Sequence, residues 1–341
     1  MKSNKPTPTL YDVAAKSGVS TATVSRCLNF PDQVTEQTRK RVMTAVRDLG
    51  YSPNFGAKVM AARRTKTIGA IIPTMENAIF ARGLQAFQEE LRVHGYTMLV
   101  ASSSYQADLE EEQIRALVAR GADALLLIGH DRNPKIYDFL EAQKVPTLVT
   151  WAFDHSQSRL SVGFDNRAAM RDLACEVIRF GHRDLALISA DTAQNDRARE
   201  RLEGIREAMT QHGLSADDLL VVQTQYGIEH GATAFSQLMQ SPRPPTAVFC
   251  GNDVLAVGAL RCAREMGVAV PGDVSITGFD DIELAQITYP PLTTVHVPHG
   301  EMGKRAARTL VDMLAGQGPD QSIELRSEIK MRGSLGAVKK Q

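Results

Sequence analysis

The first fifty residues contain three stretches in which apolar positions recur every three or four residues, as on one face of a helix. Gly18 separates the first stretch from the second, and Gly50 follows the third, where glycine commonly ends a helix. Two helices joined by a short turn and backed by a third form the helix-turn-helix arrangement. The three apolar stripes are Leu10–Val13–Ala14, Val24–Cys27–Leu28 and Val42–Val46–Leu49.

From Thr67 onward, short apolar runs alternate with amphipathic stretches, which predicts parallel sheets covered by helices on both faces. The number of runs predicts two doubly wound subdomains. The expected fold is therefore an all-α helix-turn-helix head followed by an α/β body. The predicted strands are Ile68–Ile72, Thr97–Ala101, Ala124–Ile128, Thr147–Val149, Leu160–Gly163, Leu185–Ser189, Leu220–Gln223, Ala247–Cys250 and Val274–Gly278. The predicted helices include Phe80–His94, Leu109–Arg120, Arg167–Phe180, Arg197–His212 and Val254–Met266.

Charge is distributed unevenly, although the 341 residues carry no net charge. Residues 1–66 hold twelve Lys and Arg against four Asp and Glu, which leaves 27 basic and 35 acidic residues for the rest. A basic head on an acidic body indicates a module that binds a polyanion. A basic solvated tail is the alternative, and the helical periodicity argues against it.

Composition and motifs exclude several classes of protein. No apolar run approaches the roughly 20 residues of a membrane span, and the N-terminus lacks a signal-peptide core, so we expect a cytoplasmic protein. The scattered Cys27, Cys175, Cys250 and Cys262 favour reduced thiols over a disulfide or metal site. No P-loop, dinucleotide-binding, hydrolase or zinc-protease motif appears, so we expect neither enzyme activity nor a cofactor.

Two local patterns bear on binding chemistry. The second predicted helix carries a small polar stripe opposite its apolar one, formed by Thr21, Ala22, Ser25 and Arg26. Arginine pairs with the O6 and N7 atoms of guanine and small side chains contact the thymine methyl, so this stripe suits a DNA major groove; a solvated helix face is the alternative. An H-x-x-H pattern at residues 296–299 favours a polar loop over a metal site.

The sequences TLYDVAAKSGVSTATVSRCLN, residues 9–29, and VTEQTRKRVMTAVRDLGYSPN, residues 34–54, resemble the start of the lactose-repressor/galactose-repressor (LacI/GalR) family. This resemblance implies that Thr21, Ala22 and Arg26 read operator bases. It also implies that phosphate contacts or helix caps come from Ser20, Thr23, Ser25 and Asn29. VGFDN, residues 162–166, and NFPDQVT, residues 29–35, look most like the gluconate-type members.

Residues 54–66 are expected to link a DNA-binding head, residues 1–53, to a body, residues 67–341. In the resembling family this hinge becomes helical on operator DNA, and a leucine inserts into the minor groove. Met60 stands at the matching position here, and Asn54 and Ala57 precede it on the same segment. A flexible linker is the alternative, because so short a helix is marginal in water.

The body resembles the effector-binding core of the same family, which is similar to periplasmic sugar-binding proteins. The matching stretches are IGAIIP at 68–73, GHRDLALIS at 181–189, RLEGIREAM at 201–209, FCGNDVLAVGAL at 249–260, PGDVSITGFDD at 271–281 and PPLTTV at 290–295. The resemblance implies a homodimer that binds double-stranded operator DNA and a small-molecule effector, either a sugar acid or a sugar. No sustained heptad follows Leu314, which favours a dimer over a tetramer.

Residues near predicted strand ends match effector positions of the family: Phe80, Trp151, Arg199, Arg201, Tyr226, Asn252 and Asp280. Asn and Asp bind hydroxyls, Arg pairs with a carboxylate and an aromatic ring covers a sugar face. The sequence does not choose between Arg199 and Arg201. Asn252 and Asp280 could instead cap helices. Trp151 stands after the fourth strand, where many relatives carry an aspartate, and it could instead pack in the core.

The combined interpretation is a sequence-specific transcription regulator, expected to repress carbohydrate or sugar-acid metabolism genes. A periplasmic-type sugar-binding protein is the first alternative, and the basic head argues against it. A cytosolic α/β enzyme is the second alternative, and the lack of a catalytic motif argues against it.

Overall fold

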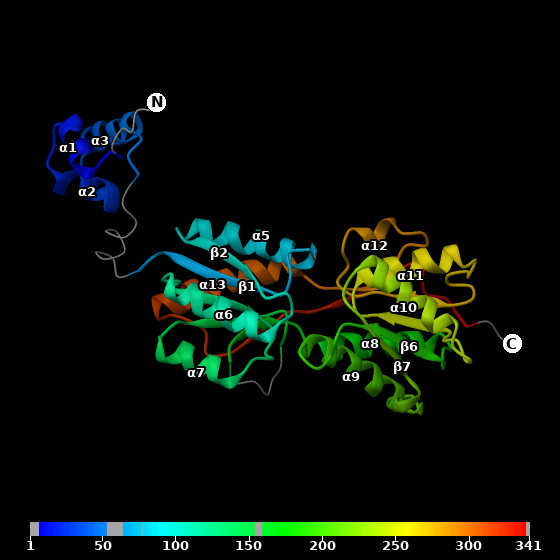
Figure 1. Ribbon diagram of the computed structural model, residues 1–341. Helices are drawn as coiled ribbons and strands as arrows, with labels where there is room; N and C mark the ends of the chain where they lie inside the picture. The colour runs from blue at the N-terminus through cyan, green and yellow to red at the C-terminus, as the bar shows by residue number, and fades with distance from the viewer. Residues whose placement is uncertain (1–6, 53–63, 77, 154–158, 339–341) are drawn as a thin grey trace. The chain divides into compact units, whose positions relative to one another are not determined.

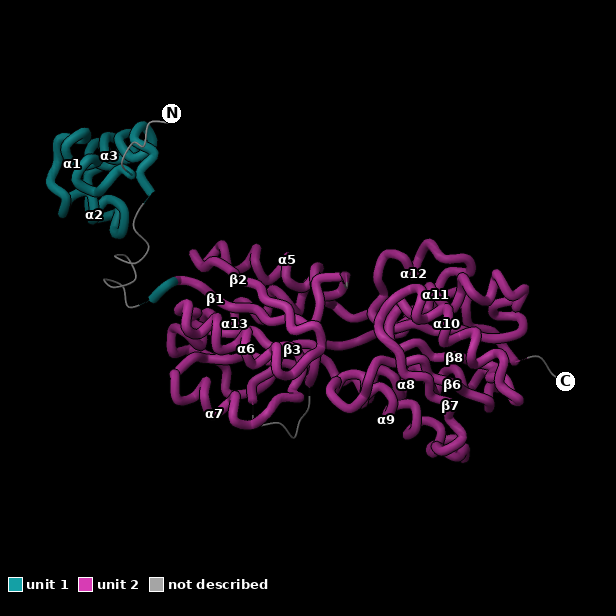
Figure 2. Tube along the Cα trace, viewed as in Figure 1, with its two compact units in different colours: residues 1–65 teal, residues 66–341 magenta. Residues whose placement is uncertain are grey.

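The computed structural model describes residues 7–52, 64–76, 78–153 and 159–338 of the chain. It divides into two compact units, Met1–Thr65 and Lys66–Gln341, coloured separately in Figure 2. Each unit has its own apolar core, and each is described by itself below.

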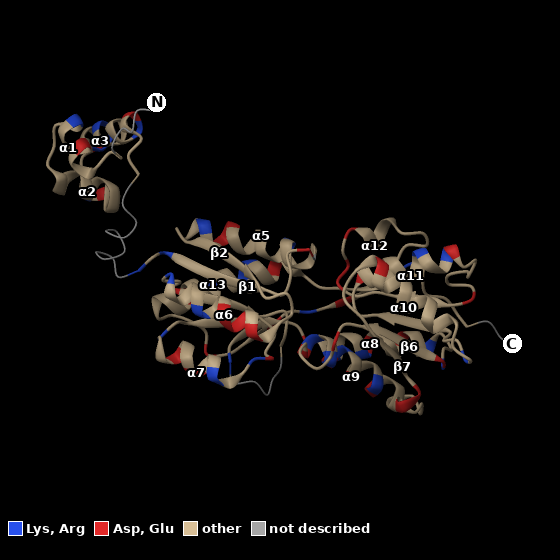
Figure 3. Cartoon of the chain, viewed as in Figure 1, with Lys and Arg blue, Asp and Glu red and all other residues tan. Residues whose placement is uncertain are grey.

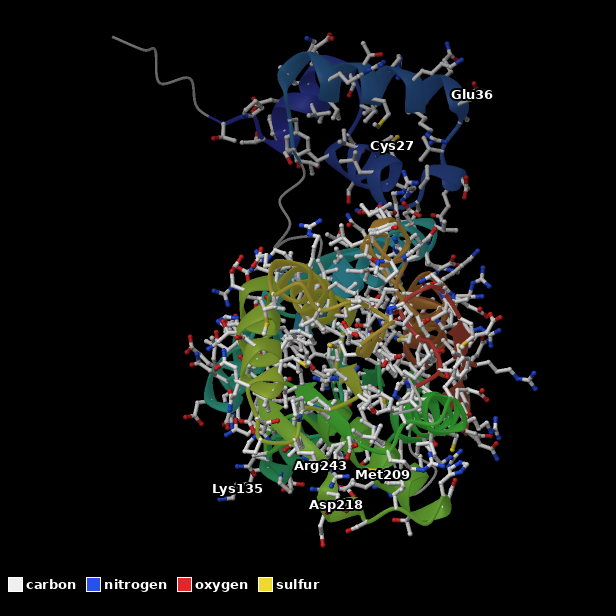
Figure 4. The ribbon with its side chains drawn as sticks, turned by 90° about the vertical axis from the view of Figure 1, so that its right-hand side faces the viewer. Cys27, Glu36, Lys135, Met209, Asp218 and Arg243 are labelled. Carbon is white, nitrogen blue, oxygen red and sulfur yellow. The ribbon has the colours of Figure 1, made fainter. Side chains whose placement is uncertain are left out.

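Over its described residues, the smaller unit contains the three helices α1 (Leu10–Ser17), α2 (Thr21–Asn29) and α3 (Glu36–Leu49), with a short 3₁₀ turn after α2 at Pro31–Gln33. Thr9 and Asp12 form a capping box at the start of α1. Gly18 and Gly50 end α1 and α3 in the left-handed conformation, as their positions in the sequence predict. The helices enclose a small core of Val13, Ala14, Val24, Cys27, Val42 and Ala45; Cys27 is labelled in Figure 4.

The larger unit begins with a six-stranded parallel sheet, in the order β11-β5-β4-β3-β1-β2. Its strands are β1 (Thr67–Ile72), β2 (Thr97–Ser102), β3 (Ala124–Ile128), β4 (Thr147–Thr150), β5 (Ser161–Gly163) and β11 (Ile323–Glu324). The helices of this subdomain are α5 (Ala78–Val93), α6 (Ala107–Ala119), α7 (Pro134–Ala142) and α13 (His299–Ala315). In Figure 1, α5 and α13 cover one face of the sheet, and α6 and α7 cover the other.

The second subdomain is built on a four-stranded parallel sheet, in the order β7-β6-β8-β9. Its strands are β6 (Leu185–Ser189), β7 (Leu220–Gln223), β8 (Ala247–Cys250) and β9 (Ser275–Thr277). Its helices are α8 (Asn166–Arg179), α9 (Asp196–Gln211), α10 (Ile228–Met239), α11 (Asp253–Glu265) and the short α12 (Leu284–Ile287), with a 3₁₀ turn at Ala216–Asp218. The pairs α8–α9 and α10–α11 pack on opposite faces of this sheet (Figure 1).

The chain passes between the two subdomains three times. It leaves the first sheet after β5 to form α8, and it returns between β10 (Thr294–His296) and α13. It leaves again after β11, and β12 (Glu328–Lys330) then pairs antiparallel with β10. The subdomains are therefore assembled from segments far apart in the sequence, and the carboxyl ends of their strands border a shared cleft.

Alternate side chains along the central strands enter different cores, which explains why these strands are nearly all apolar. In β1, Ile68, Ala70 and Ile72 pack toward α5 and α13, whereas Ile71 packs toward α6 and α7. The cluster beneath α5 and α13 continues beneath α8 and α9, so one apolar core spans both subdomains.

The predicted fold class is confirmed, and each predicted strand overlaps an observed one. The antiparallel β10–β12 ribbon was not predicted, because its strands have three residues each and no apolar run. Within the described ranges, no helix has the length and apolarity needed to cross a membrane.

Close packing of α13 on α5 yields a stability prediction. A Cβ atom on Gly303 would collide with the backbone carbonyl of Gly83 in α5, whereas one on Gly300, in the same helix, would meet nothing within 4 Å. Gly303→Ala should therefore lower the free energy of unfolding by about 1–3 kcal/mol. Gly300→Ala, the matched control, should not. Urea unfolding of both variants measures this, and equal stabilities would mean that the helix pair is not closely packed.

Candidate functional site

The exposed face of α2 presents the polar stripe that the sequence predicts. Ala22 and Arg26 are exposed, while Thr21 and Ser25 are half-buried. The Asn29 side-chain amide donates to the Ser25 hydroxyl at 3.3 Å, which orders the end of this face. Its surface is small and polar, the shape that a major groove admits.

Ser20 and Thr23 hold the start of α2. The Ser20 hydroxyl accepts from the Thr23 backbone N–H at 3.1 Å and lies 2.9 Å from the Thr23 hydroxyl. Ser20 is therefore a helix N-cap. Figure 3 colours the cartoon of the head by residue charge. The basic residues of α3 include Arg39, Lys40 and Arg41, all of which are exposed. The predicted hinge positions Asn54, Ala57 and Met60 lie outside the described residues.

The cleft between the two subdomains of the body has an outer and an inner part. The outer chamber has a volume of about 950 Å³ and opens to solvent. The inner compartment leads from it and has room for about 20 Å³. Six of the seven predicted effector residues line the inner compartment: Phe80, Trp151, Arg201, Tyr226, Asn252 and Asp280.

Trp151 forms one wall of the inner compartment, so it is both a buried side chain and a pocket residue. It follows β4 directly in the left-handed conformation, at φ 59°, and its ring lies 5.4 Å from that of Phe80. The indole N–H donates to Nδ1 of His299 at 3.2 Å. His299 begins α13 and is buried, so the predicted polar loop is wrong at this residue.

His299 connects Trp151 to Asp280. Burial lowers the pKa of the His299 imidazole to about 3, so the ring is neutral. Because Nδ1 accepts from Trp151, the ring proton sits on Nε2, which lies 3.9 Å from Oδ1 of Asp280. In the part of the chain that the structure covers, no group of three or more His, Cys, Asp or Glu side chains is arranged as metal ligands.

Asp280 is a buried carboxyl in the loop after β9, at φ 104°. Burial raises its pKa to about 7, while the charges of Arg201 and Arg197 act in the opposite direction. Its Oδ2 atom has no hydrogen-bond partner among the described residues. It caps no helix, because the short α12 begins after Glu283. The carboxyl is therefore available to a ligand.

Asn252 combines both roles that the sequence left open. Its Oδ1 atom accepts from the backbone N–H of Leu255 at 2.9 Å and caps α11. Its Nδ2 atom has no partner among the described residues, although the side chain is buried. The side chain of Asn166 likewise has one paired and one unpaired polar atom. Its Nδ2 atom donates to the Trp151 carbonyl at 3.0 Å, and its Oδ1 atom has no hydrogen-bond partner among the described residues.

The two candidate arginines of α9 face different surroundings. Arg201 lies over the Phe279 ring at 4.7 Å and donates to the Tyr226 hydroxyl at 3.3 Å. Arg199 does not line the inner compartment; its guanidinium forms a two-pronged ion pair with Asp131 of the other subdomain, at 2.7 and 2.9 Å. Of these two arginines, only Arg201 is placed to contact a ligand in the cleft.

Sequence reasoning missed several lining residues, including Tyr105, Asn166, Asn195 and Arg197. Arg197 had a usable signal, because it lies four residues before Arg201 and so shares its helix face. Tyr105 had none: it enters the cleft from a loop in which Ser104 and Tyr105 both adopt positive φ. Burial raises the pKa of its hydroxyl above the ordinary value.

The raised pKa of Asp280 predicts a pH-dependent stability difference. The folded state keeps this proton up to about pH 7, whereas the unfolded chain loses it near the ordinary value of 3.8. The group therefore lowers stability as the pH rises between these values. Asp280→Asn should become more stable than the parent over that window, by on the order of 2–4 kcal/mol. Urea unfolding from pH 4 to pH 8 measures this, with the exposed Asp217→Asn as control; parallel curves for Asp280→Asn and the parent would contradict it.

Comparisons with known proteins agree with this architecture. Residues 9–54 match the family described as bacterial regulatory proteins, lacI family, and residues 175–335 match the periplasmic binding protein-like domain. The HTH-type transcriptional repressor CytR of Escherichia coli K12 is 34% identical over 339 residues, covering 99% of both chains.

Two solved structures extend the similarity to three dimensions. A LacI-family transcriptional regulator from Silicibacter pomeroyi has a TM-score of 0.87 and 26% identity, over 96% of this chain and 99% of that one. The transcriptional regulator CelR in complex with cellobiose has a TM-score of 0.71 and 29% identity, over 96% and 99%. The helix-turn-helix head, the two-subdomain body and these matches show that the chain belongs to the lacI family of bacterial regulatory proteins and is a DNA-binding transcription regulator.

Proposed function

We propose that this protein is a cytoplasmic, homodimeric repressor whose effector is a polyhydroxylated carboxylate, a sugar acid, bound at the inner compartment, which widens from its present volume of about 20 Å³ to admit it. The observation that carries the effector class is the unsatisfied chemistry there. Buried polar atoms without described partners are Nε of Arg201, Nδ2 of Asn252, Oδ1 of Asn166 and Oδ2 of Asp280. Leaving such atoms unpaired costs about 1–3 kcal/mol each, so a ligand that pairs them gains affinity.

Arg201 favours an acid over a neutral ligand. Among the described residues, no carboxylate oxygen lies within 4 Å of its guanidinium, in contrast to Arg197 and Arg199. A buried guanidinium without an ion-pair partner attracts a carboxylate, which it binds through two parallel hydrogen bonds. Asn252 and Asp280 then form hydrogen bonds with hydroxyl groups of the ligand, and the Trp151 ring packs against the carbon chain or ring of the ligand.

A neutral sugar is the second candidate. The carboxyl of Asp280 has a pKa of about 7. Its ionised form accepts hydrogen bonds from sugar hydroxyls, and its protonated form also donates one. The relative CelR is described in complex with cellobiose, a neutral sugar.

The roles that we propose for residues of the head depend on their positions on the exposed face of α2. Thr21, Ala22 and Arg26 read bases in each half-site of a pseudo-palindromic operator, and Ser20, Thr23, Ser25 and Asn29 bind phosphates or order the helix. The hinge, residues 54–66, contributes Asn54, Ala57 and Met60 to the minor groove. Domain limits of 1–53 for the head and 67–341 for the effector core complete this assignment.

Effector and operator are coupled through the body. A ligand that contacts both subdomains favours one arrangement of the cleft, and its affinity then depends on whether the heads hold operator DNA. The coupling is reciprocal, so operator binding changes effector affinity by the same factor.

The arginine assignment predicts the binding of sugar acids. Trp151 is the only tryptophan of the chain and lines the compartment, so its fluorescence reports occupancy. Arg201→Ala should weaken binding of gluconate or glucuronate by about tenfold to a hundredfold, because a charge-assisted hydrogen bond is lost. The matched control on the same helix is Arg206→Ala, which removes a half-buried arginine that pairs with Glu203 and does not line the cleft. Equal affinities for the parent and Arg201→Ala would contradict the proposal.

The assignment of α2 predicts base-specific losses. Arg26→Ala should cost about 1–3 kcal/mol at one base position of each operator half-site and relax the preference there. Arg39→Ala, which removes an exposed arginine of α3, should weaken binding to all DNA sequences by the same factor. Operator selection followed by competition binding at fixed salt distinguishes the two results. Uniform weakening by Arg26→Ala would assign that arginine to a phosphate instead.

A further inference from the structure

The outer chamber and the inner compartment are lined from overlapping sets of strand ends. Residues that follow β4, β5 and β9, such as Trp151 and Asp280, line the inner compartment and not the outer chamber. The outer chamber is lined by residues that follow β1, β2, β6, β7 and β8, and β2 and β7 are edge strands of their sheets. From the inner compartment, the cleft therefore extends toward the β2 and β7 edges.

The chemistry of the walls changes along this direction. Two arginines, Arg197 and Arg201, line the inner compartment. Among the described residues that line the outer chamber there is no lysine or arginine, and its acidic groups are Glu76 and Asp191. Most of its other polar side chains are amides and hydroxyls, including Gln106, Gln194, Gln223, Gln225, Ser104 and Thr224. Such a wall suits a neutral, hydroxyl-rich group and disfavours a second anion.

The two spaces share a boundary that one ligand can contact from both sides. Tyr105, Tyr226, Asn195 and Asn252 line both of them. The two tyrosine rings come from opposite subdomains and lie 5.8 Å apart. Asn252 is buried, and its Nδ2 atom has no described partner. An unpaired hydrogen-bond donor at this boundary is expected if a ligand that extends across the boundary accepts from it.

The volume of the chamber supports a ligand larger than one sugar unit. Pockets for small molecules measure about 300–1,000 Å³, and the outer chamber, at about 950 Å³, is near the upper limit. A six-carbon acid held at Arg201 would leave most of this space to water.

We infer that the outer chamber is a second subsite, for a neutral saccharide unit joined to the acid. The effector is then a glycosylated sugar acid of the aldobionate class, with its carboxylate at Arg201 and its second sugar against the glutamine-rich wall. This inference rests on the proposed binding of a sugar acid, and it adds the size and the neutral half of the ligand.

Calorimetric titration of the full-length protein tests the second subsite. The probes are gluconate, lactobionate and maltobionate, which are galactosyl- and glucosyl-gluconate, and lactose. We expect at least one aldobionate to bind about tenfold or more tightly than gluconate, and more tightly than lactose. The double variant Gln106→Ala/Gln225→Ala should bring its affinity down toward that of gluconate. Gln237→Ala, an exposed glutamine of α10 outside the cleft, is the matched control.

The outcomes separate this inference from the proposed function. If gluconate binds and neither aldobionate binds more tightly, the second subsite is wrong and the sugar-acid site stands. If an aldobionate binds more tightly but the double variant keeps the advantage, the outer chamber is not the subsite. If lactose binds and gluconate and the aldobionates do not, both the acid and the subsite assignments fail. Circular dichroism of the double variant checks that it is folded.

Discussion

The need to pair buried polar atoms is the constraint on which the cleft of this protein depends. The buried Asp253 shows a fully paired arrangement: its two carboxyl oxygens have hydrogen-bond partners in the Thr294 hydroxyl and the Ile282 backbone N–H. In the inner compartment, Asp280, Asn252 and Arg201 each retain an atom with no described partner. Because such atoms destabilise the folded protein, their concentration at one place is best explained by a ligand that completes them.

The fold brings these residues together through its chain crossings. Parallel strands end on the same side of a sheet, so each subdomain offers one edge of loops and helix starts. His299 lies at the return from β10 to α13 and bonds to Trp151 of the first sheet, while its other nitrogen faces Asp280 of the second subdomain. One crossing therefore places His299, at the start of α13, between Trp151 of the first subdomain and Asp280 of the second.

The sequence was sufficient for the strands that contain apolar runs and for half of the residues that line the inner compartment, because strand ends are visible as the ends of apolar runs. It did not distinguish Arg199 from Arg201, although the one-turn spacing of Arg197 and Arg201 pointed to the shared face. His299 was misjudged because its burial results from the packing of α13, which no local pattern encodes. Tyr105 was missed because its direction is set by positive φ angles at two non-glycine residues. The hinge positions remain predictions.

The ion pair between Arg199 and Asp131 has a consequence for the rate of ligand exchange. The inner compartment has room for about 20 Å³, enough for a water molecule, so a ligand the size of the proposed sugar acid binds there only if the subdomains separate and the compartment widens. That separation breaks the ion pair and also the hydrogen bond from the His130 backbone to Asp196. Both ion-pair side chains are about one-third exposed, and dissolved salt screens such pairs. Ionic strength therefore acts on this regulator at two separate places: on phosphate contacts at the head, and on the residence time of the ligand in the body.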